Sequence, residues 1–212
     1  ALAHFAEIAL HRTQGQLHEH YQFYSPGLNQ EIASRHVLSN QLRDAIRRDE
    51  LVLHFQPQVS LKSGRIAGFE ALVRWNHPER GLLMPAEFIS LAEESDLILA
   101  LGEWVLRAAC LQCKAWERQG SHPVTVAVNL SAMQFIGRDL PVTISRILSE
   151  SQVNPSYIEL ELTESVSMDD PEKSIGIMMH LRKLGIALSI DDFGTGYSNL
   201  SYLKRFPVGR LK

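Results

Sequence analysis

Polar residues that could bind a metal ion stand in several strand-like segments of this chain. Each is expected at the C-terminal end of an apolar strand: Glu70 in GFEALVRW, Asn129 in VTVAVNLS, Glu161 in YIELELTES, Asp191 in IALSIDDFG and Lys212 in PVGRLK. Carboxylate and amide oxygens are the ligands that hard divalent cations prefer, and a lysine supplies a compact positive charge. A single acid in a strand is most often solvent-facing or salt-bridged. Five polar residues at matching positions predict one shared site, because burying an unpaired charge is costly.

The spacing of these residues predicts the elements that position them. Asn129 and Glu161 are separated by about 30 residues, as are Glu161 and Asp191, and a (β/α)8 barrel of roughly 250 residues assigns about 31 to each strand and helix. We therefore predict an α/β fold, a (β/α)8 barrel of the TIM type, of which this chain contains about six of the eight strands. Active residues of such barrels come from the C-terminal ends of several strands.

Two helices are predicted between these strands. The segment DLPVTISRILSES has apolar residues at helical spacing, namely Leu140, Ile144, Ile147 and Leu148. The segment DDPEKSIGIMMHLRKLG has an aspartate that can cap the helix, Pro171 in the first turn and Gly185 at the end. The two predicted helices alternate with the strands, as a parallel barrel requires.

Composition limits the class of protein. The 212 residues are 45% hydrophobic, which favours a folded domain. A net charge of −3 and a pI near 6.3 argue against binding to a nucleic acid polymer. Neither a run of about 18 apolar residues nor a signal peptide is present, so we expect a cytoplasmic location. A membrane anchor of the parent protein would then lie in domains N-terminal to this chain.

The cysteines and two histidines are weaker candidates for chemistry. Cys110 and Cys113 form a C-x-x-C pattern inside a helical stretch, without the second cysteine pair that a zinc site needs or the strand-to-helix setting of a redox motif. We predict that both pack against the core. His18 and His20 could bind a metal in principle, but no acid or thiol cluster lies near them, which favours solvated side chains.

Taken together, the motifs resemble a known family. In chain order they are Gln56-Pro57-Gln58, Glu70-Ala71-Leu72-Val73-Arg74-Trp75, Val128-Asn129-Leu130-Ser131, Glu161-Leu162-Thr163-Glu164, the DDFGTGYS run from Asp191 to Ser198, and Pro207-Val208 with Lys212. They resemble the EAL domain. The resemblance implies a modified (β/α)8 barrel whose active members hydrolyse cyclic di-GMP to the linear dinucleotide pGpG with Mg²⁺ or Mn²⁺. Cleavage of a phosphodiester requires neutralised phosphate charge and an activated water, which two divalent ions can supply.

The same resemblance implies a role for each motif residue. The first metal is assigned to Glu70, Asn129, Glu161 and Asp191, and the second to Asp191 with Asp192. Lys212 is expected to orient the attacking water, which places Lys212, Glu70 and Asp191 in the catalytic set. Substrate contacts are assigned to Gln56, Leu72 and Arg74, with Arg74 pairing with a phosphate. Glu164 is expected to anchor the loop from Phe193 to Ser198.

The ends of the chain and one substitution depart from the full family pattern. Residues 1–30 are similar to the last helix and strand of a GGDEF domain with a linker, and residues 31–212 are expected to form the EAL domain. Gly209 stands where the family usually has Asp, and a glycine in a strand could loosen the placement of Lys212. The last two strands, with a further catalytic acid and a glutamine, are expected to be absent, so we expect this chain alone to be inactive.

Two other functions are compatible with the sequence. The first is a non-catalytic cyclic di-GMP receptor or signalling module, and the second is a structural remnant or dimerisation module. Receptors in this family commonly lack one or more of the metal-binding acids, all of which are present here. The resemblance also implies partners for the parent protein: cyclic di-GMP, upstream GGDEF and sensory domains, and a second copy in a homodimer formed through the EAL domain.

Overall fold

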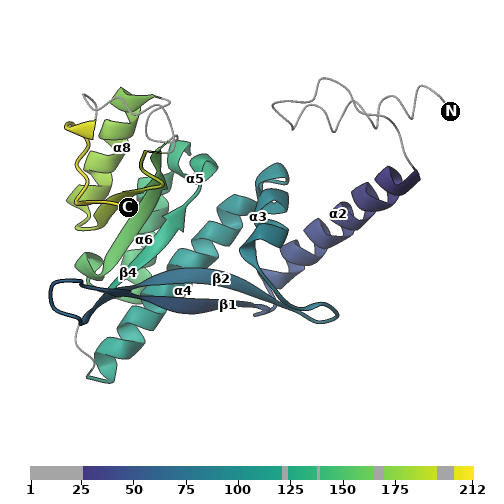
Figure 1. Ribbon diagram of the computed structural model, residues 1–212, viewed down its shortest axis with the longest axis horizontal. Helices are drawn as coiled ribbons and strands as arrows, with labels where there is room; N and C mark the ends of the chain where they lie inside the picture. The colour runs from purple at the N-terminus through teal and green to yellow at the C-terminus, as the bar shows by residue number, and fades with distance from the viewer. Residues whose placement is uncertain (1–25, 121–123, 138, 165–169, 195–202) are drawn as a thin grey trace.

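The computed structural model describes residues 26–120, 124–137, 139–164, 170–194 and 203–212 (Figure 1). Its helices are α2 (Pro26–Ala45), α3 (Pro85–Glu94), α4 (Leu97–Arg118), α5 (Ala132–Ile136), α6 (Leu140–Ser151) and α8 (Pro171–Lys183), with a 3-10 turn, η1 (Pro155–Tyr157). Its strands are β1 (Leu51–Val59), β2 (Ile66–His77), β3 (Gly81–Leu83), β4 (Thr125–Leu130), β5 (Ile158–Thr163), β6 (Ala187–Asp191) and β7 (Arg210–Leu211).

All the described strands belong to one sheet. Its order is β1-β2-β4-β5-β6-β7, and the short β3 pairs with β2. Strands β1 and β2 form an antiparallel hairpin, whereas β2, β4, β5, β6 and β7 run parallel to one another. A short connection allows only antiparallel pairing, while the parallel strands need helical crossovers. The structure confirms the predicted α/β fold, with six strands in order along the sheet. The first strand, β1, is antiparallel to its neighbour β2, whereas the strands of a regular (β/α)8 barrel are all parallel.

The helices between the parallel strands have the predicted positions. Leu140, Ile144, Ile147 and Leu148 are all buried in α6. Helix α8 begins after Asp170, whose side chain accepts a hydrogen bond of 3.2 Å from the backbone N–H of Lys173. Gly185 has φ of +90° just beyond the end of α8, a conformation that favours glycine. Among the described helices, none is long and apolar enough to cross a membrane.

The N-terminal helix crosses the predicted domain boundary. Helix α2 runs from Pro26 to Ala45, so the boundary between residues 30 and 31 falls inside it. Two side chains near its end, Leu42 and Ala45, are fully buried, and Arg35 forms an ion pair of 2.8 Å with Glu94 of α3. These contacts attach the second half of α2 to the barrel. Residues 1–25, and with them most of the predicted GGDEF-like segment, His18 and His20, lie outside the described part of the chain.

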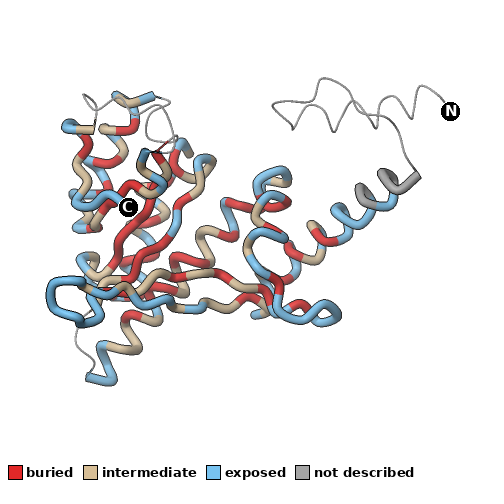
Figure 2. Tube along the Cα trace, viewed as in Figure 1, coloured by how far each residue is buried: buried red, intermediate tan, exposed pale blue. Residues whose placement is uncertain are grey.

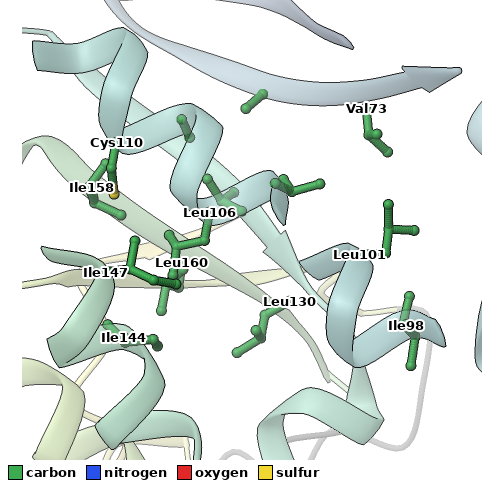
Figure 3. Close-up of a cluster of buried hydrophobic side chains, with 14 of the residues drawn as sticks. Val73, Ile98, Leu101, Leu106, Cys110, Leu130, Ile144, Ile147, Ile158 and Leu160 are labelled. Carbon is green, nitrogen blue, oxygen red and sulfur yellow. The ribbon is translucent and has the colours of Figure 1, made fainter. Parts of the chain in front are cut away.

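The core lies between the sheet and the helices. Figure 3 shows Leu106 and Cys110 of α4, Ile144 and Ile147 of α6, and residues of β4 and β5 pointing toward one another. Cys110 and Cys113 are both buried, as predicted for packing residues, and burial raises the pKa of the two thiols to about 11 and about 12. In Figure 2, the parallel strands contain most of the continuous buried chain.

Strand β5 illustrates how the sequence separates the core from the site. Ile158, Leu160 and Leu162 alternate with Glu159 and Glu161, and successive side chains of a strand point to opposite faces. The three apolar residues join the core. The two glutamates therefore face the barrel interior, away from the helices.

A glycine allows two of these strands to approach closely. A Cβ atom on Gly68 of β2 would lie 2.7 Å from the carbonyl oxygen of Thr125 in β4. That distance is shorter than real Cβ contacts, so no larger residue fits at this position without a backbone shift. Gly68 lies two residues before Glu70, and the close pairing sets the position of Glu70 relative to β4.

Candidate active site

The strand register gathers the predicted residues at the carboxyl ends of the parallel strands. Asn129 on β4 lies directly beside Glu161 on β5, and Asp191 on β6 lies beside Thr163, two residues further along β5. Carboxyl ends of parallel strands are where barrel enzymes bind their substrates. Asn129, Glu161 and Asp191 therefore lie where the sequence predicted them. Glu70 does not lie at the end of its strand: it lies near the end of the part of β2 that pairs with β4, and β2 continues to His77 in the hairpin with β1.

Direct contacts connect four of the candidate residues. The side-chain amide of Asn129 donates a hydrogen bond of 2.8 Å from Nδ2 to Oε1 of Glu70. The Lys212 ammonium lies 3.7 Å from Oε2 of Glu70 and forms a close ion pair with Oε1 of Glu161. Lys212 thus joins carboxylates from β2 and β5 across the interior of the sheet.

Backbone hydrogen bonds fix the position of Lys212. Its N–H donates to the carbonyl of Ile190 at 2.9 Å, and its carbonyl accepts from the N–H of Phe193 at 3.0 Å. The N–H of Gly209 donates to Leu188 at 2.9 Å, so the glycine that departs from the family pattern still pairs with β6. The substitution at position 209 therefore leaves Lys212 beside its two carboxylates.

Glu161 is the most buried charged group of the site. It is 1% exposed, and burial raises the pKa of its carboxyl, with the charges of Glu70 and Asp191 adding to the rise and Lys212 opposing it. Within the described part of the chain, Oε2 of Glu161 has no hydrogen-bond partner. Because a buried carboxylate oxygen without a hydrogen-bond partner is costly, binding of a cation beside it would stabilise the site.

The residues present fit a divalent metal ion. Glu70, Asn129, Glu161 and Asp191 offer only oxygen donors, which suit Mg²⁺ or Mn²⁺. In the arrangement of the described side chains, no three acids, histidines or cysteines are grouped as ligands. The ammonium of Lys212 instead provides the positive charge that links Glu70 to Glu161.

The backbone turns sharply at the end of β6. Asp192 has φ of +56°, in the left-handed region that Asp tolerates better than most residues. Its N–H donates a hydrogen bond of 3.0 Å to Oδ1 of Asp191. The predicted role of Asp192 at a second metal requires its side chain to share an ion with Asp191, and this role stays a prediction.

The predicted substrate residues lie on the same face of the hairpin. Gln56 on β1 pairs with Glu70 on β2, and Leu72 and Arg74 follow Glu70 at alternate positions. Gln56 is exposed, while Leu72 and Arg74 are half-buried. Nη1 of Arg74 donates a hydrogen bond of 2.8 Å to the carbonyl of Val73. These three side chains can approach a ligand bound over Glu70, and their substrate contacts stay predictions.

Glu164 makes a contact of the kind that anchoring a loop requires. Its carboxylate Oε2 accepts a hydrogen bond of 2.8 Å from the N–H of Gly194, which follows β6. Glu164 is buried, so this bond ties the start of the loop to the end of β5. The remainder of the predicted loop, residues 195–198, lies outside the described residues.

Sequence reasoning missed a second polar layer in the interior. Glu159 and Ser189 are buried, at 5% and 0% exposure. An oxygen of each, Oε1 of Glu159 and Oγ of Ser189, lacks a hydrogen-bond partner in the part of the chain that the structure describes. The signal that could have found Glu159 is its place two residues before Glu161, which puts it on the same strand face.

A comparison with protein families decides the assignment. The family described as "EAL domain" matches residues 39–212. The chain belongs to the EAL domain family. This finding confirms the resemblance that the motifs carried.

Two curated proteins resemble this chain over nearly its whole length. The bifunctional diguanylate cyclase/cyclic di-GMP phosphodiesterase MucR of Pseudomonas aeruginosa is 42% identical over 207 residues, which cover 98% of this chain and 30% of MucR. The cyclic di-GMP phosphodiesterase PdeR of Escherichia coli is 37% identical and covers 100% of this chain and 32% of PdeR. The chain thus spans about a third of the length of these relatives.

A solved structure supports the fold. The PaMucR phosphodiesterase in a c-di-GMP complex is 46% identical to this EAL domain and superimposes with a TM-score of 0.78. The match covers 81% of this chain and 70% of that chain. The EAL barrel is therefore shared and is partly covered by the present sequence.

Proposed function

We propose that this EAL domain hydrolyses one phosphodiester bond of cyclic di-GMP to give linear pGpG. The observation that carries the proposal is the buried Glu161 carboxylate, which lies beside Asn129 and shares the Lys212 ammonium with Glu70. Relatives at about 40% identity include proteins named as cyclic di-GMP phosphodiesterases. The PaMucR structure contains c-di-GMP itself.

Two sets of side chains, which share Asp191, would bind two metal ions. Glu70, Asn129, Glu161 and Asp191 would hold one Mg²⁺ or Mn²⁺, and Asp191 with Asp192 would hold a second. When bound, such ions neutralise phosphate charge and supply an activated water. The buried position of Glu161 excludes bulk water from one side of the site and strengthens its attraction for a cation.

The remaining residues orient the reactants. Lys212 carries three N–H donors on a compact ammonium and is held between two carboxylates, which suits it to orient a water against the phosphate. Arg74 has further N–H donors besides the one directed at Val73, and a guanidinium binds phosphate oxygens in a bidentate manner. Gln56 and Leu72 would contact the remainder of the nucleotide.

A non-catalytic cyclic di-GMP receptor is the second candidate. The observation that favours it is the link from Glu70 to Glu161 through Lys212, with no group of three ligands among the described side chains. Such a receptor would bind the dinucleotide equally well with and without divalent ions. A phosphodiesterase would require the ions for turnover.

Calorimetry combined with product analysis distinguishes the two candidates. Cyclic di-GMP is titrated into the whole protein in Ca²⁺, which replaces Mg²⁺ as an oxygen-ligated ion, and in EDTA. The products formed in Mg²⁺ are then separated by chromatography. The phosphodiesterase predicts pGpG in Mg²⁺ and its loss in Asp191→Asn, with Glu93→Gln on the exposed face of α3 as a matched control. Tight binding without product in either metal would support the receptor.

We also propose a place for the chain in a longer protein. Residues 1–30 would end a GGDEF-like domain and residues 31–212 would begin the EAL domain. The much greater length of MucR and PdeR supports this arrangement, and MucR is named as a bifunctional cyclase and phosphodiesterase. Limited proteolysis of the whole protein would test it, since cleavage N-terminal to the second half of α2 should release an intact EAL domain.

A further inference from the structure

A second acid and base pair joins β5 to β7, with a buried carboxylate and a guanidinium that is 44% exposed. The guanidinium of Arg210 on β7 lies 3.7 Å from Oε2 of Glu159 on β5. Two residues further along each segment, Lys212, which directly follows β7, pairs with Glu161 of β5. The two pairs form a ladder that joins β5 to β7.

Small residues on β6 leave room for this ladder. Ala187 pairs with Glu159, and Ser189 pairs with both Glu161 and Arg210, so β6 separates the members of each pair. Alanine and serine on the interior face of β6 are short enough for side chains from β5 and β7 to meet across it. A larger residue at either position would block one of the pairs.

Arg210 also reaches the opposite end of the described sheet. Its Nη1 donates a hydrogen bond of 2.9 Å to Oε1 of Gln58 on β1. Strands β1 and β7 are the two end members of the strand order, and no described strand joins them directly. One guanidinium therefore connects three strands, β1, β5 and β7, through side chains alone.

Lys212 directly follows a very short strand, and contacts from Arg210 can add to the backbone hydrogen bonds that hold it. Strand β7 contains two residues, Arg210 and Leu211, and follows Gly209, which has no side chain to pack. Since strand side chains alternate, a shift of β7 by one residue would turn Lys212 to the helix-facing side of the sheet. The side chain of Arg210 contacts Glu159 on β5 and Gln58 on β1, and these two contacts oppose that shift.

We propose that Arg210 is a positioning residue that, through Glu159 and Gln58, holds the Lys212 ammonium between Glu70 and Glu161. This inference rests on the proposed function only where catalysis is the readout. Arg210 itself is two residues from the reacting centre and is not a catalytic residue.

A double-mutant cycle tests whether Arg210 acts through Lys212. In the whole protein, Arg210→Ala is expected to lower kcat about 10-fold to 100-fold with KM within about twofold, because misplacing a reacting group by about 1 Å can cost that much. In the background of Lys212→Ala, adding Arg210→Ala should lower kcat less than about twofold. Arg210→Lys should restore part of the activity. Arg35→Ala, which removes an arginine paired with Glu94, is the matched control. A loss that is fully additive with Lys212→Ala would overturn the proposal.

Hydrogen exchange provides a readout that does not depend on activity. The amides of Lys212 and Phe193 both report on the pairing of Lys212 with β6. Arg210→Ala should accelerate their exchange at least about tenfold and leave the amide of Leu106, in the middle of α4, unchanged. Exchange at the wild-type rate would refute the positioning role. If the wild-type protein hydrolyses no cyclic di-GMP, the proposed function fails, and the exchange measurement still decides the role of Arg210.

Discussion

The contact between Lys212 and Glu161 makes a sharp prediction about stability in the absence of metal. Lys212→Met removes the ammonium and keeps a side chain of similar length. Glu161 then retains a buried carboxylate with no cation beside it in the described part of the chain. We expect Lys212→Met to destabilise the EAL domain in EDTA, and Glu161→Gln to remove most of that loss when the two changes are combined.

The magnitude follows from the exposure of the two side chains. Removing one partner of a fully buried ion pair costs about 3–5 kcal/mol, mainly from the charge left behind. The Glu161 side chain is 0% exposed and that of Lys212 is 22% exposed, so water screens one end of the pair. We therefore expect Lys212→Met to cost about 2–3 kcal/mol and the double variant about 1 kcal/mol or less. The coupling free energy should exceed about 1 kcal/mol.

Urea unfolding in EDTA measures these differences. Tryptophan fluorescence follows the EAL domain, because Trp75 is fully buried and Trp104 and Trp116 pack against the same core. Arg35→Met is the control, since it removes an exposed ion pair and should cost less than about 1 kcal/mol. Costs for Lys212→Met and Glu161→Gln that simply add would refute the buried pair as described.

Three further predictions concern other parts of the structure. Arg74→Ala should raise KM for cyclic di-GMP several-fold in steady-state kinetics with kcat within about threefold, because a phosphate clamp acts in ground and transition state alike; a selective fall in kcat would contradict it. Gly68→Ala should destabilise the domain by about 1–3 kcal/mol in urea unfolding, because its Cβ meets the carbonyl of Thr125, and an unchanged midpoint would show that the strands can separate. Since burial raises the pKa of the Cys110 and Cys113 thiols to about 11 and about 12, little thiolate exists at pH 8. Alkylation of the folded protein, followed by mass spectrometry, should then be at least about 100-fold slower than that of an exposed thiol and should accelerate as pH rises. Rapid labelling of either cysteine at pH 8 would contradict this expectation.

The fold and most of the strand placements could be predicted because periodicity and spacing are local properties. The alternation in YIELELTES fixes which residues of β5 face the core, and the interval to Asp191 leaves room for one helix. Helix α8 was predictable from its capping residue and its terminal glycine. By contrast, the domain boundary predicted between residues 30 and 31 falls inside α2, which begins at Pro26 because a proline is tolerated in the first turn of a helix.

The contacts within the site could not be read from the sequence, because they depend on which strands meet. The link from Asn129 to Glu70 joins two strands that are separated by α3 and α4 in the chain. The bond from Arg210 to Gln58 joins residues 152 positions apart. Glu159 was missed for a related reason: its place on the same strand face as Glu161 follows from the sequence, but its burial and its pairing with Arg210 depend on how β5 and β7 come together.

Turnover of cyclic di-GMP by the whole protein tests the proposed phosphodiesterase activity directly. The whole protein is incubated with cyclic di-GMP in Mg²⁺, Mn²⁺ or EDTA, and the nucleotides are separated by liquid chromatography. We expect linear pGpG with either metal, none in EDTA, and a loss of at least about 1,000-fold in Glu70→Ala, because this change removes a proposed metal ligand and a contact of Lys212. Hydrolysis within tenfold of wild type in Glu70→Ala, or equal turnover in EDTA, would contradict this prediction.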